Sequence, residues 1–141
     1  MPNMDPKKCP MPVQEPEARI RNFSEVALGY TYDMAVGEAR RCLSCKNKPC
    51  VSGCPVGIDI PAFVARVAAE DMEGAWEVLS ASTALPAVCG RVCPQENQCE
   101  GKCVRGIKGE PVGIGRLERL AADWHRVHTD AKPEVPVQNG H

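Results

Sequence analysis

The stretch CLSCKNKPCVSGCP, residues 42–55, places four cysteines close together and closes on a proline. Its spacing is Cys-x2-Cys-x4-Cys-x3-Cys-Pro. A second group, with the spacing Cys-Pro-x4-Cys-x3-Cys, begins at Cys93. The two groups hold most of the chain's 9 cysteines, namely Cys42, Cys45, Cys50, Cys54, Cys93, Cys99 and Cys103. We expect these thiols to decide the fold.

The compartment indicated by the sequence is a reducing one. The chain has 141 residues and an odd number of cysteines, which fits a complete disulfide framework poorly. Its first residues contain no apolar run of the signal-peptide type, and no segment approaches the length of a membrane span. We therefore expect a cytoplasmic protein that meets no membrane, in which clustered thiols act as metal ligands or catalytic groups.

The charge balance excludes one class of partner. Lys and Arg number 17 against 18 Asp and Glu, and the pI is near 6.3, so the chain lacks the basic surface of a nucleic-acid-binding protein. The three histidines form no set with an acid and a nucleophile. We expect no nucleic-acid partner and no catalytic residue in this chain on its own.

The cysteine spacing is typical of iron-sulfur cubanes, whose irons prefer soft thiolate ligands. In two-cluster ferredoxins the run Cys-x2-Cys-x2-Cys-x3-Cys-Pro binds one cluster with three cysteines and lends the last to the other cluster. Here the middle gap is four residues, but the terminal x3-Cys-Pro is the same. We therefore expect two [4Fe-4S] clusters with crossed ligands. Cys42, Cys45, Cys50 and Cys103 would bind the first, and Cys54, Cys93 and Cys99 the second.

Other interpretations of the cysteines remain open at this point. A zinc-stabilised module that docks onto a larger subunit is the main alternative, although tetrahedral zinc sites usually pair two short Cys-x2-Cys knuckles and this chain has one. Disulfides or free thiols are a further alternative. Cys9 and Cys89 lie outside the crossed scheme, and we expect Cys9 to be free and Cys89 to be a small buried thiol.

The second cluster lacks a fourth ligand among the grouped cysteines, and the last helix offers two candidates. On a helical projection from Ile114, Glu118 lies at about 40°, on the flank of the apolar arc, where an unpaired carboxylate would be costly to bury. His125 is the rival ligand. A boundary position with Glu118 paired to Arg105 or Lys108 is the structural alternative. On the same projection Arg116 and Arg119 fall on the polar face.

We expect a mainly α fold, a small helical domain with long loops that hold the clusters. Thr31 and Asp59 are good N-caps for helices over residues 32–42 and 60–71. Further helices are expected over 73–81 and 112–128, with a short helical turn over 94–99. We divide the chain into an extended Pro-rich arm (1–22), the helical two-cluster iron-sulfur domain (23–128) and a linker (129–141).

Three motifs in the same order resemble one protein family: CLSCKNKPCVSGCPVGIDIP, LPAVCGRVCPQENQCEGKC and VGIGRLER. The chain resembles the N-terminal two-cluster domain of the glutamate synthase small (beta) subunit. Similar domains occur in the large subunit of NADH-dependent ferredoxin:NADP oxidoreductase and at the N-terminus of dihydropyrimidine dehydrogenase. The resemblance covers about residues 39–124 and implies an alpha-helical ferredoxin-like fold.

The resemblance also implies a function and a ligand set. Domains of this family carry two [4Fe-4S] clusters and relay single electrons between an FAD in the following NAD(P)H-binding domains and the flavin or cluster of a partner. The implied ligands are Cys42, Cys45, Cys50 and Cys103 for one cluster, and Cys54, Cys93, Cys99 and Glu118 for the other. Relatives carry Gln or Glu at the position of Glu118, and Cys89 aligns with a cysteine that is not a ligand.

The partners implied are the chain's own C-terminal FAD and NAD(P)H domains and a larger flavin-containing subunit. The sequence ends at His141 without the Gly-rich flavin-binding loop that follows in the family. We therefore expect a fragment of a glutamate synthase-type NAD(P)H-dependent oxidoreductase that is not catalytic alone, with FAD and NAD(P)H bound only in a missing C-terminal region.

Overall fold

A computed structural model describes residues 3–129 of the chain. Within that range the elements are helices, and β pairing is limited to one isolated bridge between Val13 and Ala27. The predicted mainly α fold is therefore confirmed. The α-helices are α1 (Pro16–Arg19), α2 (Tyr32–Ala39), α3 (Pro49–Ser52), α4 (Ile60–Ala68), α5 (Met72–Ser80), α6 (Pro86–Val92) and α7 (Ile114–His128). Short 3-10 helices are η1 (Gln95–Asn97), η2 (Glu100–Lys102) and η3 (Val104–Ile107).

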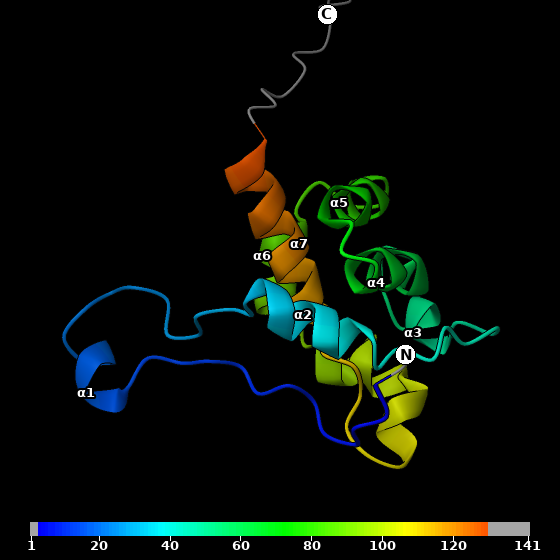
Figure 1. The fold of residues 1–141 in the computed structure, drawn as a ribbon, viewed down its shortest axis with the longest axis horizontal. Coiled ribbons are helices and arrows are strands. Elements are labelled where there is room, and N and C mark those ends of the chain that lie inside the picture. The colour runs from blue at the N-terminus through cyan, green and yellow to red at the C-terminus, as the bar shows by residue number, and fades with distance from the viewer. Residues whose placement is uncertain (1–2, 130–141) are drawn as a thin grey trace, which may run out of the picture.

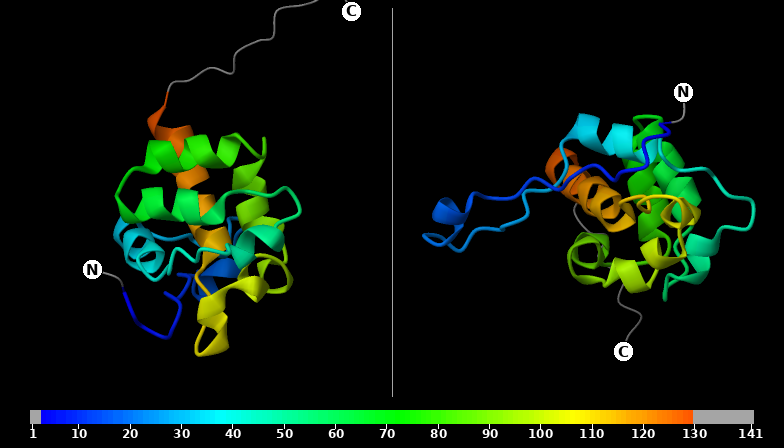
Figure 2. Two further views of the ribbon diagram at one scale, coloured as in Figure 1. Left: turned by 90° about the vertical axis from the view of Figure 1, so that its right-hand side faces the viewer. Right: turned by 90° about the horizontal axis from the view of Figure 1, so that it is seen from below.

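The longest helix, α7, runs through the body of the molecule, and the other helices pack around it (Figure 1). α6 packs along one side of α7, while α2, α4 and α5 contact it from other sides. α4 and α5 lie side by side and cross α7 as a layer (Figure 2, left). The core between these helices is formed by fully buried apolar side chains, including Phe63, Val64, Leu79, Leu117 and Ala121.

Two predicted N-caps begin helices as expected. The hydroxyl of Thr31 accepts a hydrogen bond from the Met34 amide at 3.4 Å, and the carboxylate of Asp59 accepts one from the Ala62 amide at 3.3 Å. These side chains satisfy amides that a helix start leaves without partners, and both sit one residue before α2 and α4. Local capping chemistry therefore placed both helix starts correctly.

The helix ends were predicted less well. α2 stops at Ala39 rather than Cys42, because the amides of Arg41 and Cys42 bond to Glu38 and Ala39 in tight 3-10 turns. α7 starts at Ile114, two residues later than expected, and the turn after Pro94 is the 3-10 helix η1. The sequence prediction also missed α6, whose outward Val88 and Val92 leave no clear apolar stripe.

The N-terminal arm has two different parts. Residues 12–28 project from the body as a loop that carries α1 at its tip (Figures 1 and 2). Residues 3–11 instead lie along the body. Arg41, buried at the end of α2, donates to the carbonyl oxygens of Asp5 (3.0 Å) and Pro6 (3.2 Å) and pairs with buried Glu38 at 2.6 Å. Glu38 also accepts from the amides of Cys9 and Gly113, each at 2.8 Å.

The helical projection of α7 needs one correction. Arg119 was assigned to the polar face, but only 7% of its surface is exposed. The base of the arm covers it: the Glu25 carboxylate accepts from Arg119 at 3.0 Å, and a Cβ on Gly29 would lie 3.4 Å from its guanidinium. A projection describes one helix and cannot show that a distant segment packs on its polar face.

The division of the chain into arm, two-cluster domain and linker stays a prediction. Residues 130–141, which hold nearly all of the predicted linker, lie outside the described residues. Among residues 3–129, no helix is long and apolar enough to cross a membrane.

Candidate metal centre

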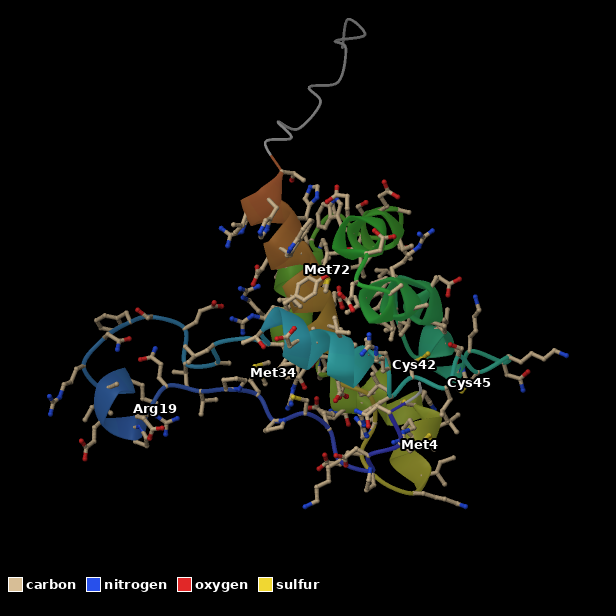
Figure 3. All side chains as sticks on the ribbon, in the orientation of Figure 1. Met4, Arg19, Met34, Cys42, Cys45 and Met72 are labelled. Carbon is tan, nitrogen blue, oxygen red and sulfur yellow. The ribbon has the colours of Figure 1, made fainter. Side chains whose placement is uncertain are left out.

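Short helices and loops at one end of the molecule present the grouped cysteines. Cys42 and Cys45 follow α2, Cys50 lies in α3, and Cys54 comes just after it. Figure 3 labels Cys42 and Cys45 where the chain runs from α2 toward α3. Cys93 is the C-cap of α6, Cys99 precedes η2, and Cys103 lies between η2 and η3. The fold thus brings the two sequence groups to the same region.

The first predicted set of thiols lines one pocket. Cys42, Cys45, Cys50 and Cys103 share this lining with apolar side chains that include Ile60, Val64 and Ile114. Burial raises the pKa of Cys50 to about 11, and the neighbouring Cys103 and Cys42 thiols add to the shift. Burial likewise raises the pKa of Cys42. A cationic metal group is what would stabilise four clustered thiolates in such an apolar lining.

The second predicted set also forms a neighbourhood. Burial raises the pKa of Cys93, and the Cys89 thiol, the Glu118 carboxylate and Cys54 add to this shift. The pKa of buried Cys99 rises to about 12, first through burial and then through Glu100, Cys54 and Glu118. Cys54 and Glu118 therefore each lie within electrostatic reach of both Cys93 and Cys99.

The two cysteine groups approach each other closely through their backbones. A Cβ atom on Gly53 would lie 2.6 Å from the carbonyl oxygen of Gln98. Such a contact is sterically forbidden, so the segment before Cys54 and the segment before Cys99 pack backbone against backbone. Cys54 belongs to the first sequence group but reaches the second set at this point.

Glu118 is the group that most clearly lacks a partner. Only 6% of its surface is exposed, and its buried Oε1 has no hydrogen-bond partner among residues 3–129. Burial raises the pKa of this carboxyl to about 7. A buried carboxylate without a partner costs free energy, and coordination to an iron would remove that cost. This feature fits an iron-sulfur cluster held by three thiolates and one carboxylate.

The alternatives for Glu118 have other arrangements in the structure. Arg105 donates to the carbonyl oxygen of Asp5, and neither Arg105 nor Lys108 pairs with Glu118 within residues 3–129. The rival ligand His125 bonds through Nδ1 to the Glu73 carboxylate at 3.0 Å. Its ring stacks on Trp76 with 4.2 Å between the ring centroids. His125 is thus held away from the thiols by partners of its own.

An ion-pair network missed by the sequence prediction joins the elements that carry Cys93 and Glu118. Arg91 of α6 donates to Asp123 of α7 at 2.7 and 3.1 Å, and to Glu25 of the arm at 2.5 and 3.2 Å. The bidentate contacts fix the relative position of α6 and α7. The charges are far apart in sequence: the packing of α6 on α7 brings Arg91 to Asp123, and the packing of the arm adds Glu25.

Single-ion sites receive no support from the geometry. Among the described residues 3–129, no group of three or more His, Cys, Asp or Glu side chains is placed to hold one metal ion. The ligands of a cubane spread further apart, because each binds a different iron.

The two remaining cysteines lie apart from the first set and differ from each other. Cys89, in α6, is half-buried rather than fully buried, and it contacts Cys93. Cys9 lines a hollow of about 910 Å³ between the arm and α2 that includes none of the other cysteines. Neither joins the first set of thiols.

Comparison with known proteins gives one family and several relatives. Residues 19–130 match the model of the family described as dihydropyrimidine dehydrogenase domain II, 4Fe-4S cluster. The NAD-dependent dihydropyrimidine dehydrogenase subunit PreT of Escherichia coli K12 is 37% identical over 104 residues, which are 74% of this chain and 25% of the relative. The glutamate synthase [NADPH] small chain of Halomonas elongata is 36% identical over 119 residues, 84% of this chain and 24% of the relative.

A third relative, the putative oxidoreductase AegA of Escherichia coli K12, is 38% identical over 108 residues, which are 76% of this chain and 16% of the relative. The chain therefore spans about a quarter or less of the length of these relatives.

Proposed function

Because the chain belongs to the dihydropyrimidine dehydrogenase domain II family of 4Fe-4S proteins, we propose that it relays single electrons through two [4Fe-4S] clusters. Iron-sulfur binding and an electron-transfer role follow from the family. We further propose how many clusters the chain binds, which residues are their ligands, and which groups donate and accept the electrons. The proposal is supported by one observation: Cys42, Cys45, Cys50 and Cys103 line one pocket, whereas Cys54 and Glu118 lie near Cys93 and Cys99.

The ligand assignment follows these neighbourhoods. Cys42, Cys45, Cys50 and Cys103 would hold the first cluster, and Cys54, Cys93, Cys99 and Glu118 the second. When bound, a cubane supplies a centre that takes up and releases one electron. The chain would contribute the ligands, an apolar wall of Ile60, Val64 and Ile114 beside the first set, and the α6–α7 contact that positions Glu118.

The ends of the relay are proposed from the relatives. Their names, NAD-dependent dihydropyrimidine dehydrogenase subunit and glutamate synthase [NADPH] small chain, point to a nicotinamide as the source of electrons. In this proposal an NAD(P)H-reduced FAD, bound outside the residues of this chain, is the donor. The acceptor is a flavin or cluster in a larger partner subunit, and the compartment is the cytoplasm.

A redox titration under anaerobic conditions tests the proposal. The reconstituted chain should show a broad visible absorption that bleaches on reduction and returns on oxidation, with an uptake of about two electrons per chain, one per cubane. Metal analysis of the same sample provides the control. A colourless protein that contains zinc and takes up no electrons would contradict the proposed function.

A further inference from the structure

An exposed groove lies beside the first set of thiols. It has a volume of about 410 Å³ and is lined chiefly by Met4, Leu43, Val104, Arg105, Ile107 and Lys108. We call it the cluster-side groove. Its apolar side chains are exposed, and Ile107 shows 77% of its surface to solvent. Exposed apolar side chains that line one concave surface are typical of an interaction site.

Only one layer of side chains separates this groove from the first set. Leu43, Val104 and Arg105 line both the groove and the pocket that contains Cys42, Cys45, Cys50 and Cys103. Leu43 follows Cys42 directly in sequence, and Val104 follows Cys103. A group seated in the groove would therefore lie next to the ligands of the first proposed cluster.

The charge on the groove has one sign. Its lining contains Arg105 and Lys108 and no carboxylate, and no acidic side chain pairs with either cation within residues 3–129. Two acidic residues lie next to lining residues in the sequence, but their carboxylates bond to backbone amides: Asp5 accepts from the Lys7 amide at 2.9 Å, and Glu110 accepts from the Lys8 amide at 2.6 Å. An apolar centre with a cationic rim is complementary to an apolar surface rimmed by carboxylates.

The direction of α7 favours a separate partner over residues that follow α7. Ile114, the first residue of α7, lines the pocket next to the groove, and the 15 residues of the helix then lead away from it. At 1.5 Å per residue the helix is about 22 Å long. Figure 1 shows its last turn at the end of the molecule opposite to η2 and η3. Residues after α7 would begin on the far side.

We propose that the cluster-side groove is the docking surface for a separate acidic flavoprotein, whose exposed flavin edge enters the groove with a rim of carboxylates around it. This inference rests on the proposed function, since it assigns the electron exit to the face of the first cluster. It adds which surface makes the contact and which chemistry the partner presents.

Binding of an acidic flavodoxin to the reconstituted full chain tests the proposal. We expect binding that weakens as the salt concentration rises from 0.01 to 0.15 M, because the screening length falls from about 30 to about 8 Å. At low salt, Lys108→Glu should weaken binding about tenfold through rim repulsion, and Ile107→Asp should weaken it by a similar factor through loss of the apolar contact. Isothermal titration calorimetry measures the dissociation constants.

The arm offers matched control variants. Ile20 shows 78% of its surface to solvent, close to the value for Ile107, and Arg21 is an exposed cation on the same segment. Ile20→Asp and Arg21→Glu should bind flavodoxin like the unchanged chain. If the arm variants weaken binding and the groove variants do not, the proposal is overturned.

Electron transfer to the same flavodoxin is the second readout. One electron leaves the reduced chain, and one electron and one proton enter the FMN to give its neutral semiquinone, which is followed by its absorbance. The rates of the groove variants should fall with their affinities. If all variants contain full iron and bleach reversibly, but bind and react like the unchanged chain, the groove is not the docking surface while the proposed function stands. A chain that takes up no iron would contradict the proposed function itself.

Discussion

At the scale of single residues, Glu118 decides whether the second set is a complete ligand set. Its carboxylate is buried near Cys93 and Cys99, its Oε1 has no hydrogen-bond partner in the part of the chain that the structure describes, and burial raises its pKa to about 7. If this position served only the stability of the core, an apolar side chain would be expected here. Helical periodicity made Glu118 one of two candidates, and the family resemblance implied it as the ligand. Periodicity could not exclude His125, because the contacts of His125 with Glu73 and Trp76 depend on how α5 packs on α7.

Glu118→Ala should remove one cluster and leave the other intact. The expected iron content falls from about eight to about four atoms per chain, because the second cubane loses its fourth ligand while the first keeps four thiolates. Electron paramagnetic resonance of the reduced protein and iron analysis measure the result. The matched control is Glu77→Ala, another glutamate in a helix of the body. Two unaltered clusters in the Glu118 variant would refute the assignment.

The same carboxyl predicts a pH dependence for the metal-free chain. The folded protein keeps the Glu118 proton up to a pH of about 7, whereas the unfolded chain loses it near 4.5. Between these values the folded state binds more protons, so raising the pH lowers the free energy of unfolding, by on the order of 3 kcal/mol once the pH exceeds 7. Urea unfolding from pH 5 to pH 8 measures this slope. Glu118→Gln should flatten it, and equal slopes in both proteins would contradict the prediction.

At the scale of elements, the contact between α6 and α7 positions the second set. A Cβ atom on Gly90 would lie 2.6 Å from the amide nitrogen of Arg119, so the two helices touch through their backbones at this point. The Arg91–Asp123 ion pair fixes the same contact from the side.

The helices α2, α4, α5 and α7 could be predicted from caps and apolar periodicity. α6 could not, because its glycine serves a close approach to a helix that lies far away in sequence.

Gly90→Ala should therefore be disruptive although alanine favours helices. The added methyl group pushes α6 from α7 and should cost about 2 kcal/mol of stability, as overpacking does in other cores. Loss of the second cluster should accompany this change because Cys93 and Glu118 lie on the displaced elements.

Gly37→Ala in α2 is the matched control, since a Cβ there has nothing within 4 Å. That variant should gain about 0.5–1 kcal/mol. Thermal unfolding compares the two, and a neutral Gly90→Ala would contradict the account of the α6–α7 contact.

At the scale of the whole molecule, residues 3–11 pack on the body. Lys8 pairs with buried Glu100 next to Cys99, and Arg41 uses the backbone carbonyls of Asp5 and Pro6. The sequence predicted only an extended Pro-rich segment here, because backbone carbonyls carry no sequence signal that would identify Arg41 as their partner. The cysteine motifs, in contrast, were enough to predict the family, because iron-sulfur ligation restricts both residue type and spacing.

Deleting residues 1–10 should lower stability and reduce cluster incorporation. The deletion leaves the buried Arg41 guanidinium and the Glu100 carboxylate without several partners, and such a loss costs about 3–5 kcal/mol. Chemical unfolding and iron content measure the effect. In the control variant, Met4 and Lys7 are both replaced by alanine, which keeps the backbone carbonyls and should leave the protein close to the unchanged chain. Equal stability of the deletion variant would contradict the role given to this segment.

The most direct test of two clusters with crossed ligands is the iron and acid-labile sulfide content of the anaerobically purified, unchanged chain. Two cubanes require about eight irons and eight sulfides per chain. The Mössbauer spectrum of the ⁵⁷Fe-labelled protein should show two [4Fe-4S] clusters, one of which has an iron site with an oxygen ligand. A content of four irons and four sulfides, or an all-thiolate spectrum, would contradict it.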